Sequence, residues 1–327
     1  MRYQNIHSIL IEEKCKEKGI DCRLLTPNDE EIFVLQKDGQ TLYINRAISP
    51  RLHHMTAVIS ENKIATNTLL SAAGLPIPPF MFSHSVTPDV ISFFSQHHPI
   101  VIKPFDTNKG VGIHLDIDTI EELETAFNEV RKLSELVILQ KQAKGKDYRV
   151  LVIDQKVAGV LYNEWAYVVG NGQQNLNELI AAENQQRDTV RTPIYHRAFK
   201  MLCPVDLADA EKALQQQSLT MSDVPAQGEK VYISSCGNGW AGALAIDQTD
   251  RIHPDNVELA LQIARVSQID VLGIDLRCAD IAISHKESDF AIIETNIRPS
   301  LVDHVYPTHG QSRDVVSVFL DYLFKEM

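Results

Sequence analysis

Acidic side chains follow two apolar segments in the last quarter of the chain. Asp275 comes directly after the run 271–274, and Glu294 follows 291–293, with Asn296 two residues later. Carboxylates in apolar surroundings need a partner, because burying an unpaired charge is costly. Residues two apart on a strand face the same side. Two carboxylates and an amide oxygen therefore suggest a site for Mg²⁺ bridged by phosphates, with Mn²⁺ as the alternative ion.

A lysine and a glycine-bearing turn suggest a phosphate contact nearer the N-terminus. Lys103 follows the β-branched run 100–102, and Gly110 and Gly112 lie in the turn 107–113. A lysine on a strand supplies a compact positive charge. Two glycines allow backbone N–H groups to approach phosphate oxygens without a Cβ in the way. The segment is neither a P-loop nor a dinucleotide-binding glycine motif.

A third candidate is the connector that follows the strand predicted at 136–140. The segment from Gln140 to Arg149 carries a glycine and several charged residues. Backbone groups after a strand end can contact the edge of an adenine, and Asp147 can accept hydrogen bonds from ribose hydroxyls.

Each of these patterns has a structural alternative that the residues alone leave open. Asp275 could form a buried salt bridge with Arg277 or Arg298. The glycine turn could be an ordinary hairpin with a surface lysine. The third segment could be a charged surface loop.

Hydrophobic periodicity and capping residues predict the elements that position these groups. Helices are predicted at 5–18, from Ser60 as N-cap to Gly74, after a capping box at 119–122, and at 175–186, 206–216, 254–267 and 313–326. Strands are predicted at 21–26, 31–36, 41–45, 100–102, 136–140, 148–153, 271–278 and 290–295. This irregular order predicts an α+β fold rather than a doubly wound sheet.

Composition limits the classes of partner. The 327 residues suggest about two domains, or one large composite domain. The net charge of −12 argues against DNA or RNA as the main ligand. Five cysteines without a C-x-x-C pair are typical of reduced cytosolic thiols. The first residues lack the features of a signal peptide, and no apolar run approaches a membrane span. We therefore expect a cytoplasmic protein with neither nucleic-acid nor membrane partners.

Several segments together resemble one family of enzymes. In chain order they are ENKIATNTLLSAAGLPIP, VIKPFDTNKGVGI, GKDYRVLVI, VVGNGQQNLNELI, GIDLRCADI with IIETNIRPSL, and HVYPTHGQSRDV. Their order and spacing resemble the ATP-grasp domain of cyanophycin synthetase and of the bifunctional glutathione-synthesising ligases. The resemblance implies an ATP-grasp domain at 58–327, with two α+β lobes clasping ATP, behind a small α/β domain at 1–57.

The resemblance also implies a role for individual residues. The phosphates would contact Lys63 and Lys103 beneath a flap that includes Asn108, Lys109, Gly110 and Gly112. Adenine would be bordered by Gln140, Lys141 and Ala143, and the ribose held by Asp147. Two Mg²⁺ ions would be coordinated by Asp275, Glu294 and Asn296, and Arg149 would lie near the transferred phosphate or the substrate.

Some positions depart from the family pattern. Gln140 replaces an acidic residue at the start of the adenine hinge, although its amide can still bond the adenine amino group. Two stretches on the substrate side also differ, at 163–166 and 240–243. They leave the nucleotide site intact but put the family's known substrates in doubt.

Arg298 is a second candidate catalytic residue, two positions after Asn296. The two-residue repeat of an extended strand would place Arg298 on the same face as the metal ligands. There a guanidinium could bind a substrate carboxylate or stabilise an oxyanion. The alternative is a salt bridge to Asp275 or Asp303. His304 and His309 match family positions near the active site, where a structural role is favoured for both.

The implied reaction is ligation of a small carboxylate to an amine, with amino acids or a short peptide as substrates. ATP would phosphorylate the carboxylate, and the amine would then displace phosphate from the acyl phosphate. The alternatives are an ATP-grasp phosphotransferase, a ligase with a non-amine acceptor, and a nucleotide-binding module without turnover. The resemblance to this family also suggests a homodimer.

Overall fold

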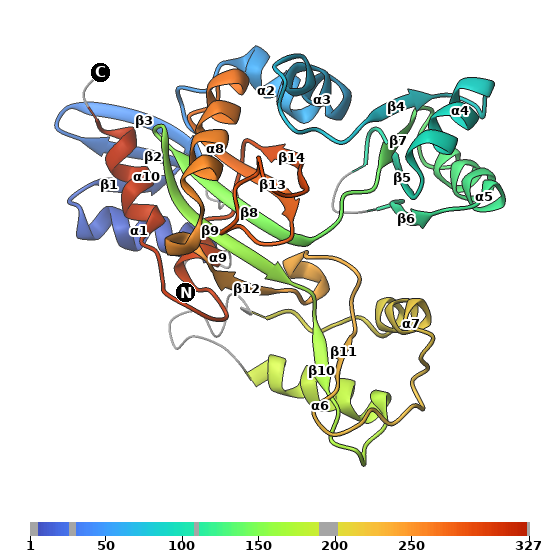
Figure 1. Ribbon diagram of the computed structural model, residues 1–327. Helices are drawn as coiled ribbons and strands as arrows, with labels where there is room; N and C mark the ends of the chain where they lie inside the picture. The colour runs from blue at the N-terminus through green and yellow to red at the C-terminus, as the bar shows by residue number, and fades with distance from the viewer. Residues whose placement is uncertain (1–5, 26–30, 108–110, 190–201, 326–327) are drawn as a thin grey trace.

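The computed structural model describes residues 6–25, 31–107, 111–189 and 202–325 of the chain (Figure 1). Its helices are α1 Ile6–Glu17, α2 His54–Glu61, α3 Lys63–Ala72, α4 Pro88–His97, α5 Ile120–Arg131, α6 Leu176–Thr189, α7 Leu207–Gln216, α8 Pro254–Ser267, α9 Val302–Val305 and α10 Val315–Leu323. Its strands are β1 Asp21–Leu24, β2 Ile32–Lys37, β3 Gln40–Asn45, β4 Phe80–Ser83, β5 Ile100–Pro104, β6 His114–Ile117, β7 Val137–Lys141, β8 Lys146–Ile153, β9 Lys156–Glu164, β10 Tyr167–Val169, β11 Lys230–Tyr232, β12 Leu244–Asp247, β13 Val271–Cys278 and β14 Phe290–Asn296. All pairings between these strands are antiparallel, which confirms the predicted α+β class.

The central sheet has the strand order β12-β9-β8-β13-β14 and is covered on both faces. Alternate side chains of a strand point to opposite faces. Val150 and Leu272 accordingly pack in the cluster that contains the buried face of α8. Ile153 and Val271 pack in the cluster that contains α10. Both helices lie against this sheet in Figure 1.

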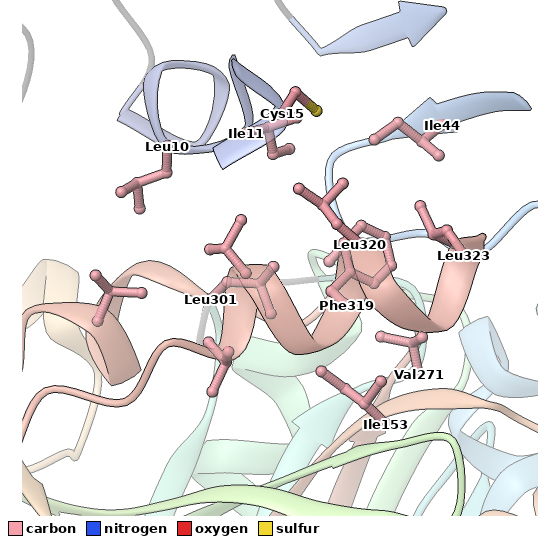
Figure 2. Packing of buried hydrophobic residues seen from close by; sticks show 14 of the residues in the cluster. Leu10, Ile11, Cys15, Ile44, Ile153, Val271, Leu301, Phe319, Leu320 and Leu323 are labelled. Atoms are coloured by element: carbon pink, nitrogen blue, oxygen red, sulfur yellow. The ribbon is translucent and has the colours of Figure 1, made fainter. Parts of the chain in front are cut away.

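The first strands form a separate three-stranded sheet, β1-β2-β3, whose core is continuous with the C-terminal helix. Figure 2 shows Leu10, Ile11 and Cys15 of α1 facing Phe319 and Leu320 of α10, with residues of the central sheet beyond. The N-terminal segment therefore buries its apolar side against the rest of the chain rather than around a core of its own.

An outer lobe contains the sheet β4-β7-β5-β6, with α4 and α5 packed on it (Figure 1). The capping box that begins α5 is present: the Thr119 hydroxyl accepts from the backbone N–H of Glu122, and the Glu122 carboxylate accepts from the backbone N–H of Thr119. The loop between β7 and β8 connects this lobe to the central sheet.

A further unit is inserted between β9 and β12. The strands β10 and β11 pair with each other, and they share a small hydrophobic cluster with α6 and α7 (Figure 1). Both helices were predicted from the sequence, at 175–186 and 206–216.

The start of the third helix is corrected by the structure. Ser60, predicted as the N-cap, lies inside α2, a helix that the sequence analysis did not predict. The N-cap of α3 is Asn62, whose side-chain oxygen accepts a hydrogen bond from the backbone N–H of Ala65. Asn and Ser are comparable capping residues, so local sequence alone did not separate the two positions.

The strand β9 and the short strands β10, β11 and β12 were also not predicted. β9 pairs with both β8 and β12 inside the central sheet, and its context there comes from segments distant in sequence. Within the described ranges, no helix has the length and apolar character needed to cross a bilayer.

Candidate functional site

Two ion pairs lie side by side on one face of the central sheet. In the antiparallel register of β8 and β13, Asp275 is directly opposite Arg149, and Arg277 is directly opposite Asp147. Side chains opposite each other across two strands are close enough to interact. These residues share the α10-side face with Ile153 and Val271, which makes one end of that face charged and the other apolar.

The Asp275 carboxylate has partners on both oxygens. Arg149 donates to it from Nε and, at 2.8 Å, from a terminal nitrogen, and the Asn296 amide donates to Oδ2 at 3.0 Å. The salt-bridge alternative considered from the sequence therefore named the wrong arginines, because Arg277 binds Asp147 and Arg298 lies elsewhere. Burial alone would lower the pKa of Arg149, but the charge and hydrogen bonds of Asp275 raise it.

Glu294 lies opposite Asp275 on β14 and makes neither an ion pair nor a hydrogen bond with the described residues. Its side chain is accessible to solvent, whereas the neighbouring Thr295 is buried. Loss of hydration and the Asp275 charge raise the pKa of Glu294, against the opposing charges of Lys103, Lys63 and Arg149. A carboxylate with no ion pair among the described residues and a second carboxylate opposite it fits a divalent cation.

Lys103 and Gln140 lie in the face of the outer lobe that is turned toward Glu294. Their strands β5 and β7 are neighbours, and Lys103 Nζ donates to Gln140 Oε1 at 2.8 Å. Burial lowers the pKa of Lys103 to about 8, with the Lys63 charge acting in the same direction and Glu294 opposing both. The electrostatic influence of Glu294 on Lys103 links the two lobes across the site.

Lys63, at the first position of α3, holds the segment that leads into the glycine turn. Its Nζ donates to the backbone oxygens of Phe105 and Thr107. Asn108, Lys109 and Gly110, predicted as part of the phosphate flap, lie outside the described residues. Gly112 is described: its φ is +75°, and a Cβ there would come within 2.7 Å of Leu133 and 2.8 Å of Pro104. Only glycine fits this end of the turn without rearrangement.

The hinge between the lobes runs from Lys141 to Asp147. Lys141 is exposed, and the backbone oxygen of Ala143 accepts from Arg277 at 3.2 Å. Gly145 has a φ of +106°, and a Cβ on it would lie 2.5 Å from the backbone of Cys278. The hinge therefore packs directly on the end of β13.

Asp147, predicted to hold the ribose, is bound by two side chains that the sequence analysis did not connect with it. Arg277 donates to it at 2.5 and 3.1 Å, and the Trp165 indole N–H donates at 2.7 Å. Trp165 belongs to the stretch 163–166 that departs from the family pattern. This departure was the only feature of the sequence that drew attention to Trp165.

Arg298 lies past the end of β14 and is 48% exposed, with a terminal nitrogen 3.9 Å from Glu31. The salt bridge to Asp275 or Asp303 that was considered from the sequence is not formed: the chain bends at 297–298, directly after β14, and Asp275 pairs with Arg149 instead.

His304 and Asp303 follow on α9, behind Arg149. His304 is 1% exposed, and neither ring nitrogen has a hydrogen-bond partner among the described residues. Burial and the Arg149 charge lower the pKa of His304 to about 3, so the ring is neutral at physiological pH. His309, in contrast, is exposed and contributes backbone contacts to β12.

We expect Lys103→Met to weaken nucleotide binding, because it removes a charged contact to phosphate and keeps an apolar stem of similar length. Loss of one charge-assisted hydrogen bond costs about 1.5–3 kcal/mol. Because the pKa of Lys103 is about 8, wild-type affinity should fall as the pH rises through 8, and the variant should lose this dependence. Calorimetry at pH 7 and pH 9 measures both, with the exposed Lys132→Met as control. Unchanged affinity would show that Lys103 does not contact the nucleotide.

Comparisons with known proteins show which proteins this chain is similar to. The chain is 35% identical over 273 residues to cyanophycin synthetase of Trichormus variabilis, covering 80% of this chain and 29% of that protein. It is 31% identical to a glutathione biosynthesis bifunctional protein of Clostridium perfringens, covering 97% of this chain and 40% of that one. The chain thus spans well under half the length of these relatives. No family model matches it.

Among solved structures, a bifunctional glutathione synthetase from Pasteurella multocida superposes with a TM-score of 0.72 at 24% identity, covering 99% of this chain and 44% of that one. This similarity concerns the fold, including the clasp of two lobes over the hinge. The chain therefore has the ATP-grasp fold and is a relative, over most of its length, of cyanophycin synthetases and of bifunctional glutathione biosynthesis proteins.

Proposed function

We propose that this protein binds Mg·ATP between the outer lobe and the central sheet and ligates a small carboxylate to an amine. The proposal rests on one observation: three cationic side chains lie near two carboxylates between the lobes. Lys103 comes from β5 of the outer lobe, Lys63 from the start of α3, Arg149 from β8, and Asp275 and Glu294 from β13 and β14.

The positive groups are suited to the charge of a triphosphate. Lys103 is buried and protonated at neutral pH, and Lys63 fixes the segment before the glycine turn. Phosphoryl transfer depends mainly on positioning and on neutralisation of charge at the phosphate oxygens. Asn108, Lys109, Gly110 and Gly112 would cover those oxygens as a flap.

The acidic groups fit Mg²⁺, with Mn²⁺ as the alternative ion. Glu294 lacks a cationic partner in the described structure, and Asp275 and the Asn296 amide lie beside it. These three residues would hold the ion, which when bound supplies neutralisation of phosphate charge. Arg149 keeps Asp275 oriented from the opposite strand.

The base and ribose would lie along the hinge. Gln140, Lys141 and Ala143 would border the base, and Asp147 would face the ribose from the position where Arg277 and Trp165 hold it. ATP would phosphorylate the substrate carboxylate, turning an oxide leaving group into phosphate. The amine would then attack the acyl carbon. Both substrates are proposed to be amino acids or a short peptide, as the names of the relatives suggest.

Release of ADP in the presence of pooled amino acids and dipeptides tests the proposal. We expect turnover only when a carboxylate and an amine are both present, and a product whose mass is their sum less one water. ADP formation with a phosphorylated product, or with no amine requirement, would identify a phosphotransferase or another ligase instead. Nucleotide binding without turnover over the whole pool would identify a binding module.

Arg298→Lys tests the proposed second catalytic residue. Lysine keeps the charge but loses the planar fork that binds a carboxylate through two hydrogen bonds. We expect the KM for one organic substrate to rise about tenfold while the KM for ATP changes little. Arg265→Lys, an exposed arginine on α8, is the matched control. Equal losses for ATP and substrate, or a lower melting temperature with normal kinetics, would assign Arg298 to structure.

The domain boundary and the oligomeric state are proposed independently of the reaction. We retain residues 1–57 as a leading domain and 58–327 as the ATP-grasp domain, although the two share one core through α1 and α10. A homodimer is proposed from family habit, and sedimentation measures it directly.

A further inference from the structure

The Gln140 side chain, which we place in the proposed nucleotide site, is buried with one end of its amide lacking a hydrogen-bond partner among the described residues. The residue is 4% exposed, and its Oε1 accepts from Lys103 Nζ at 2.8 Å. Its Nε2 has no hydrogen-bond partner among the described residues. A buried donor without an acceptor is costly, so a bound molecule that supplies one would gain affinity.

The chemistry of Lys103 fixes which end of the amide is free. A protonated lysine amine donates hydrogen bonds and accepts none, so the atom facing it must be the amide oxygen. The usual ambiguity between the two ends of a glutamine is thereby removed. Lys103 and Gln140 are diagonal neighbours on the adjacent strands β5 and β7. In the register, Lys103 pairs with Ile138 and Gln140 with Val101, so both side chains lie on the same face of the sheet.

The free donor bears on which purine the site accepts. Adenine presents an amino donor at position 6, whereas guanine presents a carbonyl acceptor there, and both present an acceptor at N7. Gln140 Nε2 can donate to the 6-carbonyl group of guanine, or to N7 of either base. Gln140 Oε1 has a second lone pair, which can still accept from the adenine amino group. One amide can therefore serve either base.

We infer that Gln140 reads position 6 of the purine and that the site accepts 6-oxopurine triphosphates, GTP and ITP, as well as ATP. This inference rests on the proposed nucleotide site and adds its base selectivity. A carboxylate at position 140 would accept from Lys103 and from adenine but would offer no donor to a carbonyl. Gln140→Glu should therefore convert a permissive site into an adenine-selective one.

Calorimetry with Mg·ATP and Mg·ITP tests the inference without knowledge of the organic substrates. ITP carries the 6-carbonyl group of GTP and lacks the 2-amino group, so it isolates position 6. We expect wild-type dissociation constants for ATP and ITP within tenfold of each other. Gln140→Glu should weaken ITP relative to ATP by at least tenfold. Gln36→Glu, the same substitution on an exposed hairpin strand, should leave the ratio unchanged.

The outcomes separate this inference from the proposed function. A wild-type preference for ATP of more than tenfold, or an unchanged ITP-to-ATP ratio in a folded Gln140→Glu protein, overturns the inference and leaves the ATP site standing. If Gln140→Glu does not fold, the wild-type comparison decides alone. Failure of the wild-type protein to bind either nucleotide overturns the proposed function, and the inference with it.

Discussion

Glu294→Ala is expected to lower Mg²⁺-dependent ADP release by on the order of 10³-fold, because it removes an anionic group that would hold the ion. The substituted residue lies on β14, where the neighbouring Ile292 and Thr295 keep the strand in the sheet. ADP release is measured at saturating Mg²⁺. Glu287→Ala, an exposed glutamate before the same strand, should keep wild-type turnover.

The same substitution should not destabilise the metal-free protein. Like charges directly opposite on two strands are destabilising, and Glu294 faces Asp275. Because the folded-state pKa of Glu294 is raised, its ionised form opposes folding above its unfolded-state pKa, and this cost is relieved as the pH falls. The melting temperature of Glu294→Ala at pH 7 should therefore equal or exceed that of the wild type. Wild-type ADP release from this folded variant would refute the metal assignment.

Arg149→Lys is expected to lower kcat by about 10²–10³-fold, the usual cost of removing one preorganised donor to developing negative charge. Lysine keeps a positive charge but cannot hold Asp275 through two parallel hydrogen bonds. Both the position of that charge and the orientation of Asp275 should therefore change. Affinity for ATP should change much less, because Lys63 and Lys103 remain. Steady-state kinetics measures the change in kcat, and calorimetry measures the change in ATP affinity.

Arg313→Lys is the matched control for that experiment. Arg313 binds Asp247 through Nε at 3.1 Å and through a terminal nitrogen at 2.6 Å, in a pair that lies outside the proposed site. The Arg313→Lys variant should lose about as much stability as the Arg149→Lys variant, while its kcat stays near the wild-type value. An equal fall in kcat for both variants would mean that the effect of Arg149 is structural.

The local elements of this fold could be predicted because their signals are local. The capping box of α5, the proline at the start of α8 and the apolar face of α10 each depend on residues within a few positions of one another. α2 was missed because it ends immediately before α3, so that Ser60 and Asn62 offered two competing starts. β9 was missed because its place in the central sheet depends on β8 and β12.

The contacts among the predicted site residues could not be predicted from the sequence. Asp275 was recognised from its apolar context, yet its partner Arg149 is 126 positions away and is selected by the register of β8 and β13. Trp165 reaches Asp147 in the same way, from the strand end that leads into the inserted unit. Spacing along the chain shows which residue types are present, whereas cross-strand register decides which of them meet.

Transfer of oxygen from the substrate carboxylate to phosphate tests the central claim most directly. With a carboxylate substrate labelled with ¹⁸O, activation through an acyl phosphate must leave one labelled oxygen in the phosphate released with each amide bond. Mass spectrometry of that phosphate measures it. We predict one ¹⁸O per phosphate released. Unlabelled phosphate, or label found in AMP, would contradict ligation through an acyl phosphate.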